Sequence, residues 1–135
     1  MMALIEFTND ELVHVQIIDD QHREIALLIN DVHKNVLDNS KNLAKDSLLK
    51  LTELLEIHFE TEERLMKENR YPGYITHKLE HDRFYNKTVK TLDQYNNNEI
   101  SLGLDQLDSF RRWFYNHIEI NDRKCANHLI SLGIS

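Results

Sequence analysis

The sequence is poor in the residues that make turns and cross-links. Its 135 residues include only three glycines, one proline and one cysteine. A fold of many short strands needs frequent turns, which usually take glycine and proline, so the composition favours long helices joined by a few short loops. The single cysteine, Cys125, cannot form a disulfide within the chain, and we expect it to be a small helix residue. The length suffices for one domain with a modest core.

Basic charge and long apolar runs are also scarce. Lys and Arg number 16 against 23 Asp and Glu, and the formal net charge is −7. Nucleic acids and anionic membranes attract basic surfaces, so we expect neither as a partner. No apolar run approaches the roughly 18 residues of a transmembrane helix, and the N-terminal MMALIEFTNDE does not resemble a signal peptide. We therefore expect a cytoplasmic protein with no membrane span, and we take a monomer as the default.

Four amphipathic stretches predict an all-α fold. Apolar residues recur in each stretch at every third or fourth position, which is the pattern of a helix with one buried face. The predicted helices span residues of about 17–37, 42–69, 74–95 and 102–130. Short connections make neighbouring helices antiparallel. We therefore predict an up-down-up-down four-helix bundle with an N-terminal arm, forming a single domain over residues 1–135.

Polar side chains occupy core positions on all four predicted helices. The apolar stripes are interrupted by His22, His58, Glu62, His77, His81 and His117. A buried histidine must satisfy two ring nitrogens, and a buried carboxylate is costly unless it is paired or binds a metal. A lone histidine on such a stripe is more often a hydrogen-bonded core residue than a ligand. That explanation does not account for a whole set on four helices.

The positions of these residues along the bundle indicate that they meet. In an antiparallel bundle the starts of the first and third helices lie beside the ends of the second and fourth. His22 is near a start, as is the pair His77 and His81, whereas His58 and His117 are near ends. At a rise of about 1.5 Å per residue, all of them fit within a layer about two turns deep. The sequence therefore predicts a metal site.

Asp122 joins this set only if the last helix is locally distorted. It follows His117 by five positions, which places it about 140° away on an ideal α-helix. A local widening, such as a π-bulge, would bring both side chains to the same face, and such bulges often mark functional sites. We therefore predict a π-bulge over residues 117–122.

The types of ligand narrow the choice of metal. Histidine with carboxylate, and without thiolate, suits iron, zinc or manganese. Seven ligands are too many for one zinc ion, and the HExxH signature of zinc proteases is absent. The Glu-x-x-His motif of ferritin-like diiron proteins occurs only at Glu11–His14, in the arm. These residues therefore do not form a ferritin-like site.

The order of the motifs resembles that of the hemerythrin family. The set is His22, His58-x-x-x-Glu62, His77-x-x-x-His81 and His117-x-x-x-x-Asp122, and the strings Asp19-Asp20-Gln21-His22 and Trp113-x-x-x-His117-Ile118 also agree with the family pattern. The resemblance covers nearly the whole chain. One departure is Phe7, which stands where many members have tryptophan and which is not a predicted ligand.

The resemblance implies a non-haem diiron centre with an oxo or hydroxo bridge. His77, His81 and His117 would hold one iron, His22 and His58 the other, and Glu62 and Asp122 would bridge them. It also implies reversible binding of molecular oxygen at the iron with two histidines, for oxygen storage, transport or delivery rather than catalysis. An oxygen-consuming enzyme is a candidate recipient.

Residues next to the predicted ligands are candidates for an oxygen pocket and for supporting hydrogen bonds. The expected pocket residues are Ile25, Phe59, Trp113, Phe114 and Ile118. Gln21 and Glu63 are candidate partners for the outer nitrogens of the ligand histidines. We expect the other histidines, His14, His33 and His128, to be surface or arm residues.

Three other functions use the same predicted site. The first is an oxygen or redox sensing module, although no linker or output module is evident in the sequence. The second is a diiron enzyme acting on peroxide or nitric oxide, although no further acid–base group is evident near the ligands. The third is iron buffering, which would require easily removed iron.

Overall fold

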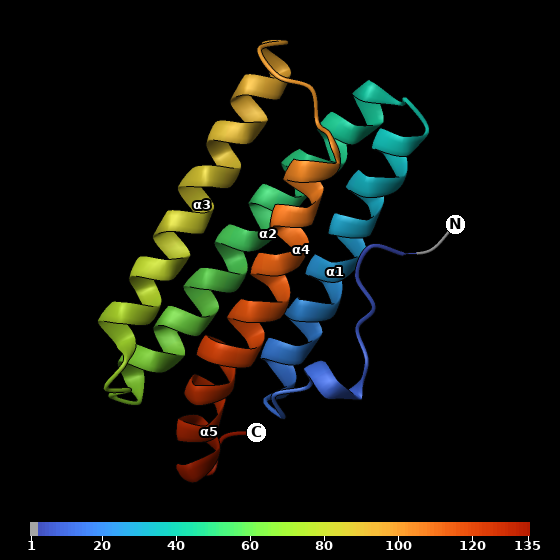
Figure 1. Cartoon of the computed structure of the whole chain (residues 1–135). Coiled ribbons are helices and arrows are strands. Elements are labelled where there is room, and N and C mark those ends of the chain that lie inside the picture. Colours follow the sequence, from blue (N-terminus) through green and yellow to red (C-terminus); the bar gives the residue numbers. More distant parts are fainter. Residues whose placement is uncertain (1–2) are drawn as a thin grey trace.

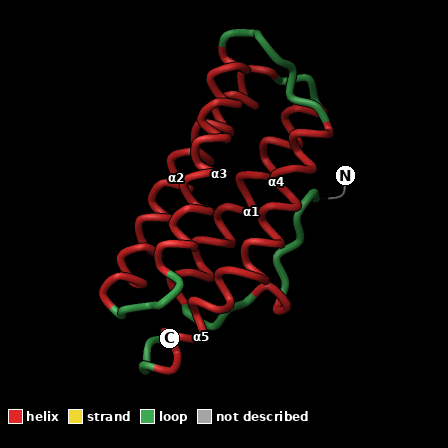
Figure 2. The backbone as a smooth tube through the Cα atoms, turned by 60° about the vertical axis from the view of Figure 1, so that its left-hand side comes forward, coloured by secondary structure: helices red, strands yellow, loops and turns green. Residues whose placement is uncertain are grey.

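Four long helices lie side by side in the computed structural model, which describes residues 3–135 (Figure 1). They are α1 (Gln16–Leu37), α2 (Lys41–Glu68), α3 (Tyr74–Asn96) and α4 (Leu104–Asn116). The fourth helix continues through a π-helical segment, η2 (His117–Asp122), into α5 (Arg123–Ser131). Within residues 3–135 no strand is present, and the connections gather at the two ends of the bundle (Figure 2). The predicted all-α four-helix bundle is confirmed.

Three helices end in the same local motif, which sets the antiparallel course. Asn39, Arg70 and Asn98 each have a left-handed backbone, with φ of 55°, 54° and 59°. In each case the N–H of the next residue bonds to a carbonyl five positions back, as in Ser40 to Asn35 at 2.9 Å. This arrangement satisfies carbonyls that the helix end would leave unpaired. The chain then reverses within a few residues.

One half of the interior is apolar, and the other half combines apolar side chains with a polar cluster. Away from the ligand cluster, the helices bury residues such as Ile29, Leu48, Leu51 and Leu107, each at most 1% exposed. These side chains come from the stripes that the sequence pattern predicts. At the other end of the bundle, the same stripes carry the histidines and carboxylates. The apolar half therefore supplies packing energy, and the polar cluster in the other half supplies the candidate site.

The N-terminal arm runs along the bundle beside α1 (Figure 1) and includes a short 3-10 helix, η1 (Asn9–Glu11). Ile5 N–H donates to the Asn30 side chain at 2.8 Å, which attaches the arm to α1. Arg123 donates to the carbonyl oxygen of Leu12 at 3.1 Å, which attaches it to α5. The arm is thus fastened to both of these helices.

The fourth helix starts two residues later than predicted and has the predicted winding. It begins at Leu104, where Gly103 N–H donates to the side chain of Gln106 at 2.9 Å. The predicted distortion is present, since residues 117–122 are π-helical. In the part of the chain that the structure describes, no helix is both long and apolar enough to cross a membrane.

Candidate metal centre

Seven buried polar side chains meet in one half of the bundle. They are His22 from α1, His58 and Glu62 from α2, His77 and His81 from α3, and His117 and Asp122 from η2. Each is at most 3% exposed. The structure therefore brings together all seven residues that the sequence predicts as ligands, and it does so with all four helices of the bundle.

The seven residues form two groups that share both carboxylates. One group contains Glu62, His77, His81, His117 and Asp122, and the other contains His22, His58, Glu62 and Asp122. In each group one donor atom per residue lies within 4.8 Å of the others, which is close enough for one ion to reach all of them. The cluster therefore offers two adjacent cation sites with three and two histidines.

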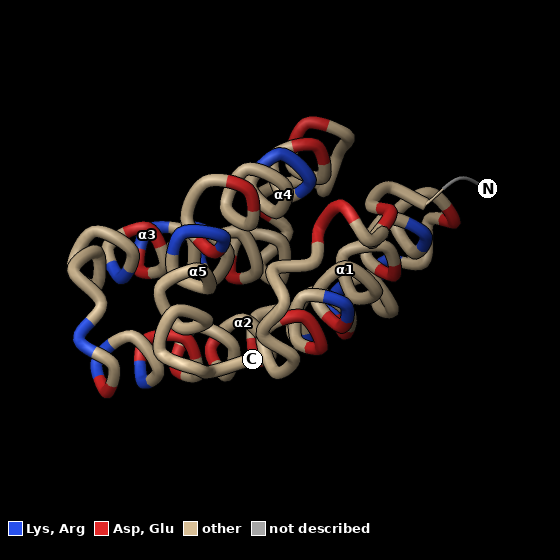
Figure 3. Tube along the Cα trace, turned by 90° about the horizontal axis from the view of Figure 1, so that it is seen from below, with Lys and Arg blue, Asp and Glu red and all other residues tan. Residues whose placement is uncertain are grey.

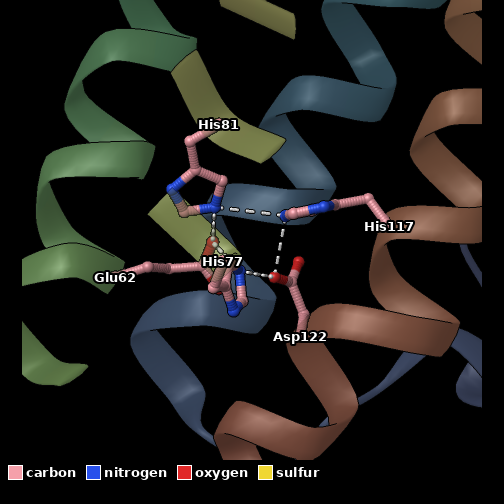
Figure 4. Close-up of side chains that lie close together, drawn as sticks. All are labelled: Glu62, His77, His81, His117 and Asp122. Atoms are coloured by element: carbon pink, nitrogen blue, oxygen red, sulfur yellow. Dashed lines mark hydrogen bonds and ion pairs between the residues drawn. The ribbon is translucent and has the colours of Figure 1, made fainter. Parts of the chain in front are cut away.

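Asp122 presents one oxygen to each group. Its Oδ1 lies 3.0 Å from Nε2 of His77 and 3.0 Å from Nε2 of His117 (Figure 4). Its Oδ2 lies 2.8 Å from Nε2 of His22. This division is the arrangement expected of a carboxylate that bridges two ions.

Glu62 also lies between the groups. Its Oε1 is 3.1 Å from Nε2 of His58 and 3.1 Å from Nε2 of His81. The first contact lies within α2, between residues one turn apart, and the second joins α2 to α3. Figure 4 shows Glu62 and Asp122 entering the cluster from opposite sides.

The π-helical winding brings Asp122 into the cluster. A π-helix pairs each N–H with a carbonyl five residues back, and here the Arg123 N–H bonds to the Ile118 carbonyl. Each turn therefore takes up an additional residue, and a residue five positions on returns to nearly the same face. Asp122 consequently faces the same interior as His117 and is fully buried.

The donor atoms fit metal ions better than they fit one another. Buried nitrogen and oxygen atoms without a hydrogen-bond partner among residues 3–135 include Nε2 of His22, His58 and His77 and both carboxylate oxygens of Glu62 and Asp122. Nε2 of His81 and Nε2 of His117 face each other at 3.2 Å, so at most one of them carries a proton toward the other. Buried polar atoms are ordinarily satisfied. Cations placed among these atoms would satisfy them all.

A hydrogen-bond chain orients His58 from outside the cluster. Nδ1 of His58 lies 2.7 Å from Oε1 of Gln21, whose Nε2 donates to the Thr61 hydroxyl at 3.1 Å. That hydroxyl donates to the carbonyl of Ile57 at 2.9 Å, so it accepts from Gln21. The amide of Gln21 therefore has its oxygen toward His58, and Nδ1 of His58 carries the proton. Nε2 is left unprotonated to bind a metal.

The Glu63 carboxylate orients His81 from outside the cluster in the same way. Nδ1 of His81 lies 2.9 Å from Oε2 of Glu63, and the Lys78 ammonium lies 3.8 Å from the other oxygen of Glu63. Hydrogen bonds of this kind fix the tautomer of a ligand histidine and raise its basicity. The predicted contacts of Gln21 and Glu63 with histidines of the cluster are therefore confirmed.

Three supporting residues lie outside the sequence-based prediction. They are Thr61, Lys78 and Asn121, whose side-chain amide lies 3.1 Å from Nδ1 of His117. Asn121 follows His117 by four positions, and this spacing could have indicated the contact from the sequence. Thr61 and Lys78 act through another polar side chain, so their own spacing to a histidine does not reveal them.

The charges of the cluster shift the pKa values of its members. Burial and the Asp122 carboxylate raise the pKa of Glu62, but the nearby His58 and His81 rings outweigh both and lower it to about 2. Burial lowers the pKa of His81, but contacts with Glu62 and Glu63 outweigh burial and raise it to about 9. In the metal-free protein the carboxylate is thus ionised and His81 is protonated at neutral pH. Metal binding must displace that proton.

Four of the five residues expected in an oxygen pocket are buried. Ile25, Phe114 and Ile118 are 1–2% exposed and Phe59 is 4% exposed. Phe59 stacks on His81 with ring centroids 4.1 Å apart, and Phe114 lies edge-on to His22 at 6.2 Å. Trp113 differs from them because it is partly exposed.

The remaining histidines lie outside the cluster. His14 is exposed in the arm and His33 is half-buried on α1. His128 was expected at the surface, but it is half-buried and its Nε2 lies 2.8 Å from the carbonyl oxygen of Asn69. This contact ties α5 to the end of α2, a long-range pairing that helix periodicity does not reveal.

Comparison with known proteins agrees with this geometry. The sequence profile of the hemerythrin HHE cation binding domain matches residues 13–128, which span all seven cluster residues. The chain belongs to the hemerythrin family. The family binds oxygen at a non-haem diiron centre, and the cluster supplies donors suited to two irons.

Similar proteins include both bacterial and animal hemerythrins. The chain is 28% identical over 123 residues to bacteriohemerythrin of Methylococcus capsulatus, covering 90% of this chain and 94% of that one. It is 31% identical over 116 residues to myohemerythrin of Sipunculus nudus, covering 82% and 91%. A crystal structure of wild-type hemerythrin superposes with a TM-score of 0.90 at 26% identity, covering 94% and 98%. The family and its fold are thus shared across nearly the full chain.

Proposed function

We propose that this hemerythrin is an oxygen carrier whose two irons are held unequally. His77, His81 and His117 would hold one iron, His22 and His58 would hold the other, and Glu62 and Asp122 would contact both. This proposal rests on one observation: the two donor groups share both carboxylates but contain different numbers of histidines. The group with two histidines leaves more of its ion's coordination free, and oxygen would bind there.

The diiron centre, when bound, supplies two electrons and an open coordination position for oxygen. The side chains around it determine whether oxygen leaves unchanged. Ile25, Phe114 and Ile118 are almost fully buried and present only hydrocarbon, which excludes water from the neighbourhood of His22 and His117. A dry pocket would slow the entry of the protons and water that promote autoxidation.

The charge of the ligand set supports carriage over catalysis. Five neutral imidazoles and two carboxylates give a centre less anionic than one built mainly from carboxylates. A less anionic set gives less stabilisation to highly oxidised iron. Reversible binding, which needs only the ferrous and ferric states, is therefore favoured over oxygen activation.

An anaerobic titration tests this function directly. Iron is counted in the reduced protein, oxygen is admitted and then removed, and the absorption spectrum is followed through several cycles. Two irons per chain and a visible band that appears with oxygen and disappears under vacuum are the expected results. Rapid and irreversible conversion to a diferric spectrum would contradict carriage and favour redox sensing. Steady turnover of peroxide or nitric oxide would favour an enzyme.

We also propose that the chain is a single-domain monomer that works in the cytoplasm and passes oxygen to an oxygen-consuming enzyme. The buried free thiol of Cys125 is compatible with a reducing compartment. Light scattering on the purified protein tests the monomer, and a stable dimer at micromolar concentration would contradict it. Cell fractionation tests the location.

A further inference from the structure

Trp113 forms the middle of a three-ring stack that leads to a metal-binding histidine. Its indole lies nearly parallel to the His117 ring, with centroids 4.8 Å apart and an interplanar angle of 14°. Phe84 covers its other face at 3.7 Å and 5°. The indole Nε1 is buried and has no hydrogen-bond partner in the described part of the chain. The ring is therefore held by stacking rather than by a polar contact.

Trp113 differs from the other ring that stacks on a cluster histidine. Phe59 lies on His81 at 4.1 Å and 16°, but Phe59 is only 4% exposed. Trp113 is partly exposed. Of these two rings, Trp113 is the one that connects the cluster to the surface.

The exposed edge of Trp113 borders a surface hollow that also reaches His117. The hollow has a volume of about 350 Å³ and lies between α3 and the fourth helix. It is lined by Glu80, Trp113, Asn116, His117, Ile120 and Asn121. In Figure 4 the His117 ring enters the cluster from η2 and points Nε2 inward. A small molecule in the hollow would thus be separated from the centre by one imidazole ring.

We propose that Trp113 is the route by which electrons enter the diiron centre from a reduced one-electron donor. The proposal rests on the proposed carrier function, because iron that has oxidised to the ferric state must be reduced before it binds oxygen again. In each step the donor would lose one electron and one ferric ion would become ferrous, with no covalent change in the protein. Electronic coupling falls steeply with the gap between groups. The partly exposed indole stacked on the His117 imidazole therefore offers a better path from the surface than the buried rings of Phe59 and Phe114, which lie beside other cluster histidines.

The first test replaces the ring. The iron-loaded diferric protein is mixed anaerobically with the methyl viologen radical cation, and its reduction is followed by stopped-flow absorption. Trp113→Leu should slow reduction several-fold, whereas Trp113→Phe, which keeps a stacked ring, should retain most of the rate. Tyr85→Leu is the control, since it removes a partly buried ring of α3 whose hydroxyl lies 3.5 Å from Glu56 on α2 and which stacks on no cluster histidine. An unchanged rate in Trp113→Leu with two irons bound would overturn the proposal.

The second test identifies the surface at which the electron donor approaches, and it leaves the three stacked rings unchanged. Ile120 is 55% exposed and lines the hollow, so Ile120→Glu should speed reduction by the viologen cation and Ile120→Lys should slow it. The effect of one charge should be roughly two- to threefold at low salt and should shrink as salt screens it.

Leu43 provides the matched control for these charges. It is 57% exposed on α2, and it precedes His58 by 15 residues, or about 22 Å of helix. That distance exceeds the Debye length of about 10 Å at 0.1 M salt, so Leu43→Glu and Leu43→Lys should leave the rate unchanged. Equal effects at both positions would contradict entry at the hollow. Oxygen binding is recorded on the same samples, so a failure of carriage is seen separately from a failure of electron entry.

Discussion

Asp122 Oδ1 lies 3.0 Å from His117 Nε2 although five residues separate them, and the π-helical winding between them makes this contact possible. On an α-helix the two side chains would diverge by about 140°. The same winding places the other Asp122 oxygen 2.8 Å from His22, on a different helix. One local distortion therefore joins three helices of the bundle at a single carboxylate, because His77 also contacts Oδ1.

Substitution of Asp122 should disrupt both cation sites at once. Asp122→Asn keeps the size of the side chain but removes the charge that would be shared by the two ions. Loss of a mere supporting hydrogen bond typically costs about 10–100-fold in metal affinity, so we expect at least the upper end of that range. The measurement is an iron titration against a chromophoric chelator. Asp93→Asn, an exposed change on α3, should have no effect, and two tightly bound irons in Asp122→Asn would exclude a bridging role.

The outer hydrogen bonds of His58 and His81 should affect the reduction potential of the centre differently, because one partner is neutral and the other is charged. Glu63→Gln keeps a hydrogen-bond acceptor for His81 but removes the negative charge, whereas Gln21→Glu adds a negative charge beside His58. A carboxylate partner makes the imidazole a stronger donor to iron. We therefore expect the reduction potential of the centre to rise in Glu63→Gln and to fall in Gln21→Glu. Spectroelectrochemical titration measures both, and shifts of the same sign would contradict this assignment.

Helix periodicity predicted most of the fold and of the cluster because both depend on local patterns. A histidine such as His58 on an apolar stripe is visible in the sequence, and so is the five-residue step from His117 to Asp122, which predicted the π-bulge. Periodicity carries no information on contacts between distant segments. The path of the arm depends on Arg123 reaching the Leu12 carbonyl, 111 residues away. The stack of Trp113 on Phe84 depends on how α3 and α4 face each other.

The pKa shifts predict how the stability of the iron-free protein depends on pH. The folded pKa of Glu62 is about 2 against an ordinary 4.5, so its contribution is present above pH 4.5 and is lost as the pH falls towards 2. The folded pKa of His81 is about 9 against an ordinary 6.5, so its contribution is present below pH 6.5 and is lost as the pH rises through 9. Both contributions are complete between these ordinary values.

Urea unfolding of the iron-free protein across this pH range checks both signs. Glu62→Gln should reduce the stability change on the acid side, where Asp122 still contributes because, despite burial, the neighbouring His117 holds its pKa well below the ordinary value. His81→Gln should reduce the change on the alkaline side, where His22 still contributes because, despite burial, Asp122 raises its pKa. The raised pKa of His81 also predicts that iron uptake releases protons and that iron binding becomes tighter as the pH rises towards 9. Iron affinity that falls over this interval would contradict the protonation of His81.

The buried side chain of Ile118 should control how long the oxygenated protein survives. Ile118 is 2% exposed and directly follows His117. Ile118→Thr introduces a hydroxyl that can hold water near the centre, so we expect autoxidation to become several-fold faster. Ile118→Val is the control for lost volume, at a stability cost of about 0.5–1.5 kcal/mol. The decay of the oxygen-dependent band gives the rate, and equal rates in the two variants would argue against a water-excluding role.

Asp19 and Asp20 are neighbours in sequence, but they should differ sharply in their effect on stability. Asp19 is 6% exposed and accepts the backbone N–H groups of Val13 at 2.8 Å and His14 at 3.0 Å, which fastens the arm to the start of α1. Asp19→Ala leaves these donors without their acceptor, at a cost of about 1–3 kcal/mol for a buried unsatisfied group. Asp20 is exposed and pairs with Arg23 at 3.2 Å, so Asp20→Ala should change stability by at most about 0.5 kcal/mol.

Urea unfolding of the iron-free variants measures this difference, and amide exchange shows where it arises. In Asp19→Ala the N–H groups of Val13 and His14 should exchange faster than in the unchanged protein. The exchange rates of amides in the apolar half of α2 should change only as far as the global free energy of unfolding changes. Asp19→Asn should fall between the two, because its single amide oxygen can still accept one of the two donors. If Asp19→Ala and Asp20→Ala unfold alike, the arm is held by its other contacts, chiefly those of Arg123 with the Leu12 and Asp10 carbonyls.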